Sequence, residues 1–421
     1  MIALVLFAPL LWALAFNRNA QSVSPRDAFL TNKGANGFRA TLAGAIAGNV
    51  GIGSFLALFL FANEAPILAF SIVGAYTLGL LLCAAFAATI RERAGLLGAV
   101  GLIDLIAKAH AMKHLTPIWI AVAFVFVLRS AVQLGALGFL AAAVFGGDAA
   151  LTIIACAALI ALYLLVGGYR AAVQSDALQA AVIVAGGVIC AFGLPNLTGT
   201  PAPFFSFGEY RPAILVGIWL FIPWSAVLAV DNWQRVTLAR STQVARSAYV
   251  CAAAVCGCLF LLMAFAGLWA AQSADLYATF AILSGPNFTW VATAMFIACI
   301  MSSIDTFIMP LVSVAAQDRP MMWTRLMICA LVGLTAMTAI LFSDTLDNII
   351  AAFNSLGVFL PAAFGALYLK RTSALAAVIS MYAGLFSALG IGLVDQNVAS
   401  VAGFVVAAMT YALVHIRTVR A

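Results

Sequence analysis

Apolar runs of about twenty residues recur from one end of this chain to the other, and each is long enough to cross a bilayer as an α-helix. Only 8% of the 421 residues are charged and 65% are hydrophobic. A water-soluble surface needs roughly a quarter of its residues charged. The sequence therefore predicts an all-α polytopic membrane protein. A β-barrel would show short alternating segments instead.

Hydropathy predicts about thirteen transmembrane helices. They are expected at residues 1–16, 37–63, 66–90, 117–146, 149–167, 175–194, 212–230, 247–271, 288–315, 322–342, 348–369, 373–393 and 398–416. Nearly all of the 20 Lys and Arg residues then fall in loops on one side. By the positive-inside rule, we expect an integral plasma-membrane protein, as in a bacterial inner membrane, with its N-terminus outside and its C-terminus in the cytoplasm.

The distribution of Lys and Arg also indicates which binding partners to expect. The net charge of +6 is explained by the loops, so it predicts topology and no nucleic-acid partner. Membrane lipid is the expected surrounding, and no obligate protein partner is evident. The polar connections are short, so the chemistry of the chain must lie inside the helix bundle.

Two expected spans are interrupted at mid-depth. Four glycines surround Asn49 and Ser54 in the span 37–63, and Pro223 lies in the span 212–230. The second of these spans is the fifth span after the first, so the two cross the membrane in opposite directions. Paired interrupted spans of opposite direction are typical of transporters built from inverted repeats. Broken backbone at that depth must line a cavity or an ion site, because lipid cannot satisfy its polar groups.

This interpretation makes the chain, 1–421, a single transmembrane transporter domain. The expected parts are an N-terminal helix with its inner loop, a first repeat, a second repeat and two extra C-terminal helices. Their residues are 1–36, 37–194, 212–369 and 373–421.

The stretch "AMFIACIMSSIDTFI" (294–308) places oxygen-bearing side chains within an apolar span. Ser302, Asp305 and Thr306 share one helix face, because they are spaced i, i+3 and i+4, and Ser303 lies next to them. Serines in membrane helices often only hydrogen-bond to neighbouring helices. A buried carboxylate costs several kcal/mol unless it is paired or coordinates something. An all-oxygen cluster suits a small, hard cation, so we expect an ion site.

Two other charges lie within or at the edge of a span. Asp176 follows "GGYRAAVQS" and either joins an ion site or caps a helix. Arg129 lies deep in "FVFVLRSAVQLGALGF" (124–139), where a charge costs roughly 2.5–3.5 kcal/mol. Its partner is either a protein carboxylate or a substrate carboxylate held by both guanidinium edges. We favour the substrate, because Asp305 is the only acid evident at that depth.

Several stretches together resemble the sodium:solute symporter family, which includes carriers of sugars, proline, pantothenate and sialic acid. "GGYRAAVQSDALQ" (167–179) resembles the signature that begins the fifth core helix of that family. "DNWQRVTLARSTQVARSA" (231–248) is similar to its inner-loop motif, and 294–308 is similar to its eighth core helix. "AGNVGIGSF" (47–55) fits the broken first core helix less closely. The order and spacing agree from about residue 25 to residue 370.

The resemblance implies a ten-helix core in a five-plus-five inverted repeat (LeuT-like), with broken first and sixth core helices. It implies one or two bound sodium ions. The first site would use the carbonyls of Ala47, Val50 and Cys299 with the hydroxyls of Ser302 and Ser303. The second, which some members have, would use Asp176, Ser302, Asp305 and Thr306. Members with the second site often carry serine in place of Asp305, whose carboxylate would tighten the site or make it proton-sensitive.

The resemblance also implies a substrate pocket. Arg129 falls where the sialic acid carriers place the arginine that holds the substrate carboxylate. The other implied positions are Asn49, Gly51 and Ser54 on the first core helix and Ile222 and Ser225 on the sixth. The polar residues that sugar carriers have on the sixth helix are missing here. A small organic acid is therefore a better match than a sugar.

The expected function is sodium-coupled symport of a small, carboxylate-bearing organic solute by alternating access. An enzyme is not expected, because no His, Cys or Ser constellation of catalytic type is present. Two alternatives remain: a proton-coupled carrier of the same fold, or a transporter-like membrane sensor with little flux.

Overall fold

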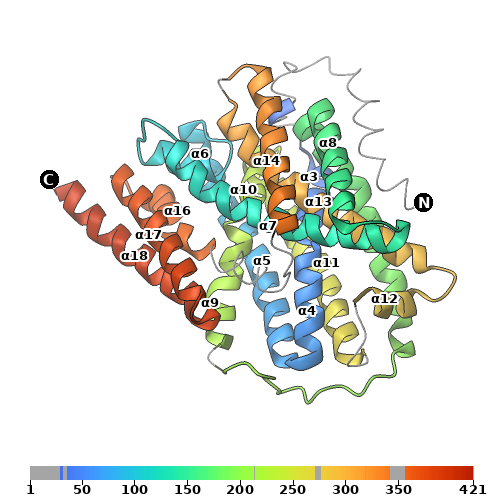
Figure 1. Ribbon diagram of the computed structural model, residues 1–421. Helices are drawn as coiled ribbons and strands as arrows, with labels where there is room; N and C mark the ends of the chain where they lie inside the picture. Colours follow the sequence, from blue (N-terminus) through green and yellow to red (C-terminus); the bar gives the residue numbers. More distant parts are fainter. Residues whose placement is uncertain are drawn as a thin grey trace.

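A computed structural model describes residues 29–31, 36–212, 214–270, 276–317, 319–341 and 356–420. These residues are helical, and they form no β-strand beyond one bridge between Asn36 and Ala239. Figure 1 shows the arrangement of the helices. The helix expected at 1–16 and the first part of the span expected at 348–369 lie outside the described residues.

The long helices are apolar enough to cross a membrane. Within the described residues, eight helices pass that test, and two bent helix pairs pass it jointly. In chain order the elements are α3 (Phe38–Asn49), α4 (Ile52–Glu64), α5 (Pro66–Leu97), α6 (Leu102–Ala109), α7 (Thr116–Phe145), α8 (Ala149–Gly193), η2 (Leu194–Asn196), α9 (Ile214–Val227), α10 (Val230–Leu238), α11 (Thr242–Trp269), α12 (Leu276–Ser284), α13 (Thr289–Ala315), α14 (Met321–Leu341), η3 (Leu356–Phe359), α16 (Leu360–Tyr368), α17 (Ala374–Gly392) and α18 (Gln396–Arg420).

Helix α8 is 45 residues long and contains two of the predicted spans, 149–167 and 175–194. At 1.5 Å per residue a straight helix of this length would measure about 68 Å, more than twice the hydrocarbon thickness of about 30 Å. Gly168 breaks it near the middle, with φ 56° and ψ −146°. The two arms therefore account for the two spans.

The first predicted interruption is present between α3 and α4, which are bent by 50°. Val50 and Gly51 form the break. A Cβ atom on Gly51 would lie 2.7 Å from the Ser303 hydroxyl and 3.0 Å from the Gln133 amide oxygen. Glycine thus lets the broken backbone approach both side chains.

The second interruption lies further along the chain than predicted. Pro223 lies inside α9, and the 45° bend falls between α9 and α10, at residues 228–229. Side chains of α10 donate hydrogen bonds to the carbonyls freed by this break. The Asn232 amide nitrogen lies 2.7 Å from the Ala226 carbonyl oxygen, and the Trp233 indole nitrogen lies 2.5 Å from the Val227 carbonyl oxygen. The expected end of this span at 230 and the inner-loop placement of 231–238 were wrong, because polar α10 is buried against protein.

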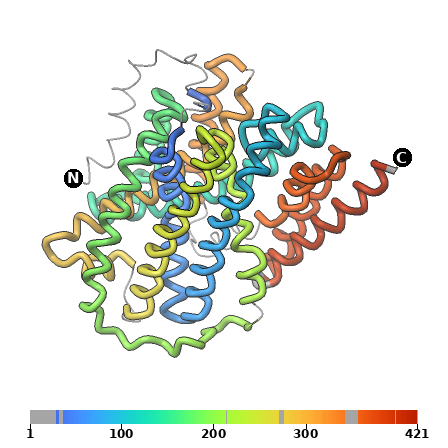
Figure 2. The backbone as a smooth tube through the Cα atoms, turned by 180° about the vertical axis from the view of Figure 1, so that it is seen from behind, coloured from blue at the N-terminus to red at the C-terminus, as the bar shows by residue number. Residues whose placement is uncertain are grey.

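Helix α13 lies at the centre of the bundle, and every residue from Val291 to Val314 on it is buried. It contacts α3, α7, α8 and α10. Figure 2 shows α11 in yellow alongside α3 and α4 in blue, and these helices are in contact. The paired helices α17 and α18 lie at one flank in Figure 1, beside α9. Both broken helices therefore meet the central helix.

Gly168→Ala tests the break in α8. Its backbone conformation is almost confined to glycine and costs other residues about 1–3 kcal/mol, and an added Cβ would lie 2.5 Å from the Phe29 carbonyl. We expect a lower thermal unfolding midpoint in detergent. Gly333→Ala on α14 is the control, because a Cβ there meets nothing within 4 Å. Equal midpoints for the two variants would contradict the role given to Gly168.

Candidate functional site

The break in the first core helix faces α13. Ala47 lies in the last turn of α3, where helix carbonyls lack partners within the helix. The Ser302 hydroxyl lies 2.7 Å from the Ala47 carbonyl oxygen and 3.1 Å from that of Cys299. The Ser303 hydroxyl donates to the same Cys299 carbonyl, at 2.9 Å. Four of the five groups predicted for the first sodium site therefore lie together.

The fifth group of that set is the carbonyl of Val50, at the break itself. Val50 is fully buried, and its N–H donates to the Ile46 carbonyl. Oxygen-only donors of this kind suit a hard cation. The carbonyl end of α3 also carries the negative end of the helix dipole. The residues present thus fit a small, hard cation.

Asn49 links the two broken helices. It exchanges amide hydrogen bonds of 3.0 and 3.1 Å with Asn232 on α10. The Tyr76 hydroxyl donates to Asn49, and the Tyr249 hydroxyl donates to Asn232. Both asparagines are buried. The network fixes the end of α3 against the start of α10.

Arg129 lies on α7, and Gln133 lies one turn further along the same face. The Gln133 amide oxygen accepts from the Ile52 N–H at 3.0 Å, at the start of α4. The Arg129 guanidinium lies 5.3 Å and 4.8 Å from the ring centres of Phe126 and Phe307. The positive charge of Arg129 and the N-terminal end of α4 both favour negative charge.

The structure supplies an acid that the sequence analysis placed elsewhere. Asp231 is buried on α10, and its carboxylate attracts the guanidinium of Arg129. Asp305 is therefore not the only acid at that depth. Arg129 therefore has a protein counter-charge nearby.

The other predicted pocket residues are more scattered. Ser54 is partly exposed on α4. On α9, the Ser225 hydroxyl donates to the Ile222 carbonyl of its own helix at 2.7 Å. Among the described contacts, neither Ile222 nor Ser225 hydrogen-bonds to Arg129. Asn49 and Gly51 thus lie at the break in the first core helix, and Ser225 donates within its own helix.

Asp305 is fully buried and is held by hydroxyl groups. The Tyr163 hydroxyl donates to its carboxylate at 2.8 Å, and the Ser175 hydroxyl lies 3.3 Å away. The Thr306 hydroxyl lies 3.3 Å from its other oxygen and also donates to the Ser302 carbonyl. Asp305 therefore faces α8, while Ser302 faces α3.

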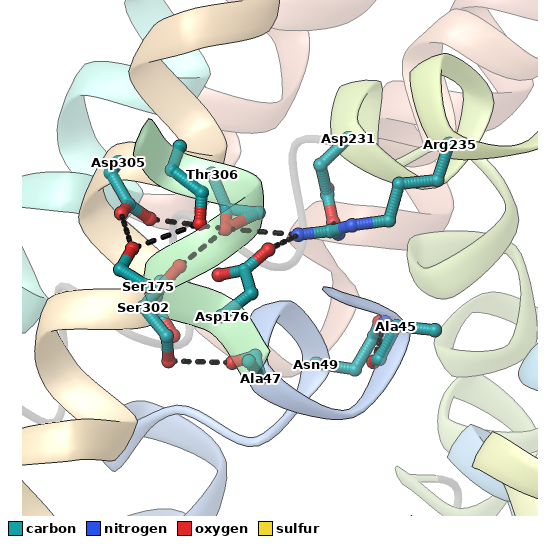
Figure 3. Close-up of polar contacts among 12 residues, drawn as sticks. Ala45, Ala47, Asn49, Ser175, Asp176, Asp231, Arg235, Ser302, Asp305 and Thr306 are labelled. Carbon is teal, nitrogen blue, oxygen red and sulfur yellow. Dashed lines mark hydrogen bonds and ion pairs between the residues drawn. The ribbon is translucent and has the colours of Figure 1, made fainter. Parts of the chain in front are cut away.

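Asp176 is bound by a residue that the sequence analysis did not select. Arg235 on α10 donates from Nη2 to Asp176 at 3.1 Å and to Thr306 at 3.1 Å. Its Nη1 pairs with Asp231, one turn earlier on the same helix. Figure 3 shows the guanidinium between the two carboxylates.

The missed residues belong to one short helix. Asp231, Asn232, Gln234 and Arg235 are all at most 6% exposed. The available signal was the i, i+4 spacing of Asp231 and Arg235, which favours an ion pair on a helix. A cavity of about 10 Å³ adjoins this pair and Asp176, which is room for about one water molecule.

Comparisons with known proteins identify the fold. No protein-family model matches the chain, and no curated protein matches it. A solved structure of a Na⁺-coupled sialic acid symporter in a substrate-bound outward-open state is similar, with a TM-score of 0.78 at 14% identity over 97% of this chain and 95% of that one.

Two other solved structures are similar over most of their length. Mhp1, a nucleobase-cation-symport-1 family transporter with bromovinylhydantoin bound, has a TM-score of 0.60 at 14% identity, covering 92% of this chain and 94% of that one. A manganese transporter of Eremococcus coleocola has a TM-score of 0.55 at 11% identity, covering 93% and 96%. These likenesses confirm the predicted LeuT-like fold and leave the family a prediction.

Asn49→Ala tests the network between the broken helices. It would leave Tyr76 and Asn232 without their partner, and a buried polar group without a partner costs about 1–3 kcal/mol. We expect a lower thermal unfolding midpoint in detergent than for the exposed control Asn287→Ala. The network would have no structural role if both variants unfolded at the wild-type temperature.

Proposed function

We propose that this protein is a sodium-coupled secondary transporter of the sodium:solute symporter type. It would import a small, carboxylate-bearing organic solute by alternating access across a bacterial inner membrane. The proposal combines the inverted-repeat fold with the chemistry of the break in the first core helix. The bound partners would be sodium, the solute and membrane lipid.

One observation carries the proposal. The Ser302 hydroxyl lies 2.7 Å from the Ala47 carbonyl, so oxygen ligands from α13 meet the broken end of α3. A sodium ion held by Ala47, Val50, Cys299, Ser302 and Ser303 would supply the positive charge that joins these two elements. The ion would thereby fix the direction of α4 and the position of Gly51, next to Gln133.

Arg129 supports an anionic substrate. Its planar guanidinium can hold a carboxylate by two parallel hydrogen bonds. The N-terminus of α4, which Gln133 contacts, offers a second element suited to negative charge. Asn49, Gly51 and Ser54 would complete the pocket on the first core helix, with Ile222 and Ser225 on the sixth.

In this mechanism sodium would bind first from outside and order the pocket for the solute. The loaded carrier would then rock inward, with its N-terminus outside and its C-terminus in the cytoplasm. Sodium would leave into the cytoplasm, where its concentration is low. The membrane potential contributes about 2.3 kcal/mol per net charge moved for each 100 mV.

Asp305 favours a second candidate, a proton-coupled carrier of the same fold. It is a fully buried carboxylate whose partners in the described region are hydroxyl groups. Protonation would remove its charge without an ion. Thermal unfolding midpoints measured in sodium and in choline at several pH values separate the two couplings. Sodium should raise the midpoint of a sodium carrier at every pH, whereas the midpoint of a proton-coupled carrier should depend on pH and not on sodium.

Replacing Ser302 or Ser303 with alanine removes one hydroxyl ligand of the proposed sodium. We expect the half-saturating sodium concentration for thermal stabilisation to rise at least about tenfold, equivalent to about 1.4 kcal/mol. The control is Ser380→Ala on α17, a buried serine that donates within its own helix. An unchanged sodium dependence in both site variants would rule out this site.

Arg129→Lys keeps the positive charge but loses the planar fork. We expect sodium to stabilise this variant as it does the wild type, while carboxylate affinity falls at least about tenfold, or about 1.4 kcal/mol. Binding is measured by thermal shift across a panel of small carboxylates in sodium, with Arg325→Lys as the control, because Arg325 is exposed on α14. Wild-type carboxylate affinity in Arg129→Lys would contradict the proposed binding of the substrate carboxylate by Arg129. Binding without uptake in liposomes would instead indicate a sensor.

A further inference from the structure

The expected second sodium site contains a guanidinium group. Arg235 Nη2 lies 3.1 Å from Asp176 and 3.1 Å from the Thr306 hydroxyl. These are two of the four groups that the family resemblance assigns to the second ion. Arg235 is 6% exposed, so the contact is buried.

The other two groups of that set have hydrogen-bond partners of their own. The Ser302 hydroxyl faces the Ala47 carbonyl at 2.7 Å. The Asp305 carboxylate accepts from the Tyr163 hydroxyl at 2.8 Å. Three of the four groups, Asp176, Asp305 and Thr306, line the cavity of about 10 Å³ together with Arg235. The guanidinium thus lies among the oxygens that would otherwise hold a second sodium ion.

Helix α3 is built to receive the arginine. A Cβ on Gly44 would lie 2.5 Å from Arg235 Nε, and a Cβ on Gly48 would lie 2.6 Å from Nη1. The two glycines are four residues apart, on one face of the helix. Any larger residue at either position would push the guanidinium away from Asp176.

The guanidinium supplies positive charge at the place where a second sodium ion would bind. The guanidinium already pairs with Asp176 and Asp231. One fixed positive charge is thus shared between two carboxylates.

We propose that Arg235 is a tethered cation that replaces the second sodium ion, so that each chain binds one sodium ion, at the first site. This inference rests on the proposed sodium coupling for its stoichiometry. Its consequence concerns charge movement: symport of one sodium ion with a monovalent carboxylate would be electroneutral. Two sodium ions per carboxylate would move one net charge.

The test counts bound sodium. Equilibrium binding of ²²Na⁺ to the purified protein in detergent should give one ion per chain for the wild type, and Ser302→Ala should weaken it. Arg235→Gln should gain a second ion, because it frees two carboxylates, and its thermal unfolding midpoint should become more sodium-dependent. Arg235→Lys keeps the charge and should stay at one ion.

The other outcomes bear either on the tethered cation or on the proposed sodium coupling. Two ions per wild-type chain, falling to one in Asp176→Asn, would overturn the tethered cation, as would a folded Arg235→Gln that binds no more sodium than the wild type. If Arg235→Gln does not fold, the wild-type and Arg235→Lys counts decide. If the wild type binds no sodium, the proposed function fails, and a sodium ion gained in Arg235→Gln would still support the inference.

Discussion

Two helices break inside the membrane, and the rest of the transport core follows from the need to satisfy the backbone groups that these breaks free. Lipid offers no hydrogen-bond partner. At the first break, the Ser302 hydroxyl and the Gln133 amide oxygen hydrogen-bond to backbone groups of Ala47 and Ile52. The second finds the side chains of Asn232 and Trp233. The buried polar residues at the breaks therefore stabilise the fold as well as provide candidate ligands.

Charge balance sets a second constraint on this core. Among the described residues, the buried acids near the two breaks are Asp176, Asp231 and Asp305, and the buried guanidiniums belong to Arg129 and Arg235. The remaining buried acid, Asp104, pairs with Lys108. When all those near the breaks are ionised, three negative charges face two positive ones. One monovalent cation, or one proton, would neutralise the difference. This balance agrees with a single sodium ion and an arginine that serves two carboxylates.

The sequence predicted the helical architecture and the break in the first core helix, because apolar runs and clustered glycines are local signals. It also predicted a cluster at Ser302 and Ser303. The prediction placed the second break at Pro223, which was wrong, because a proline can remain within a helix in a membrane bundle. Helix α10 was missed, because hydropathy detects helices that face lipid and α10 is polar and buried against protein.

The partners of buried charges could not be predicted in the same way. Asp176 and Arg235 are 59 residues apart, and their contact depends on how α8 and α10 both pack against α3, at Gly44. The assignment of Asp305 to one face with Ser302 was correct for an ideal helix. The two side chains nevertheless choose different partners, on α8 and on α3.

The central claim is that sodium joins the break in the first core helix to α13. Hydrogen–deuterium exchange of the purified protein in sodium, compared with potassium, tests it directly. The account predicts slower exchange in sodium for amides at 47–54 and 299–306, with no change in the flanking helices α17 and α18. Equal exchange in both salts at the break would contradict it.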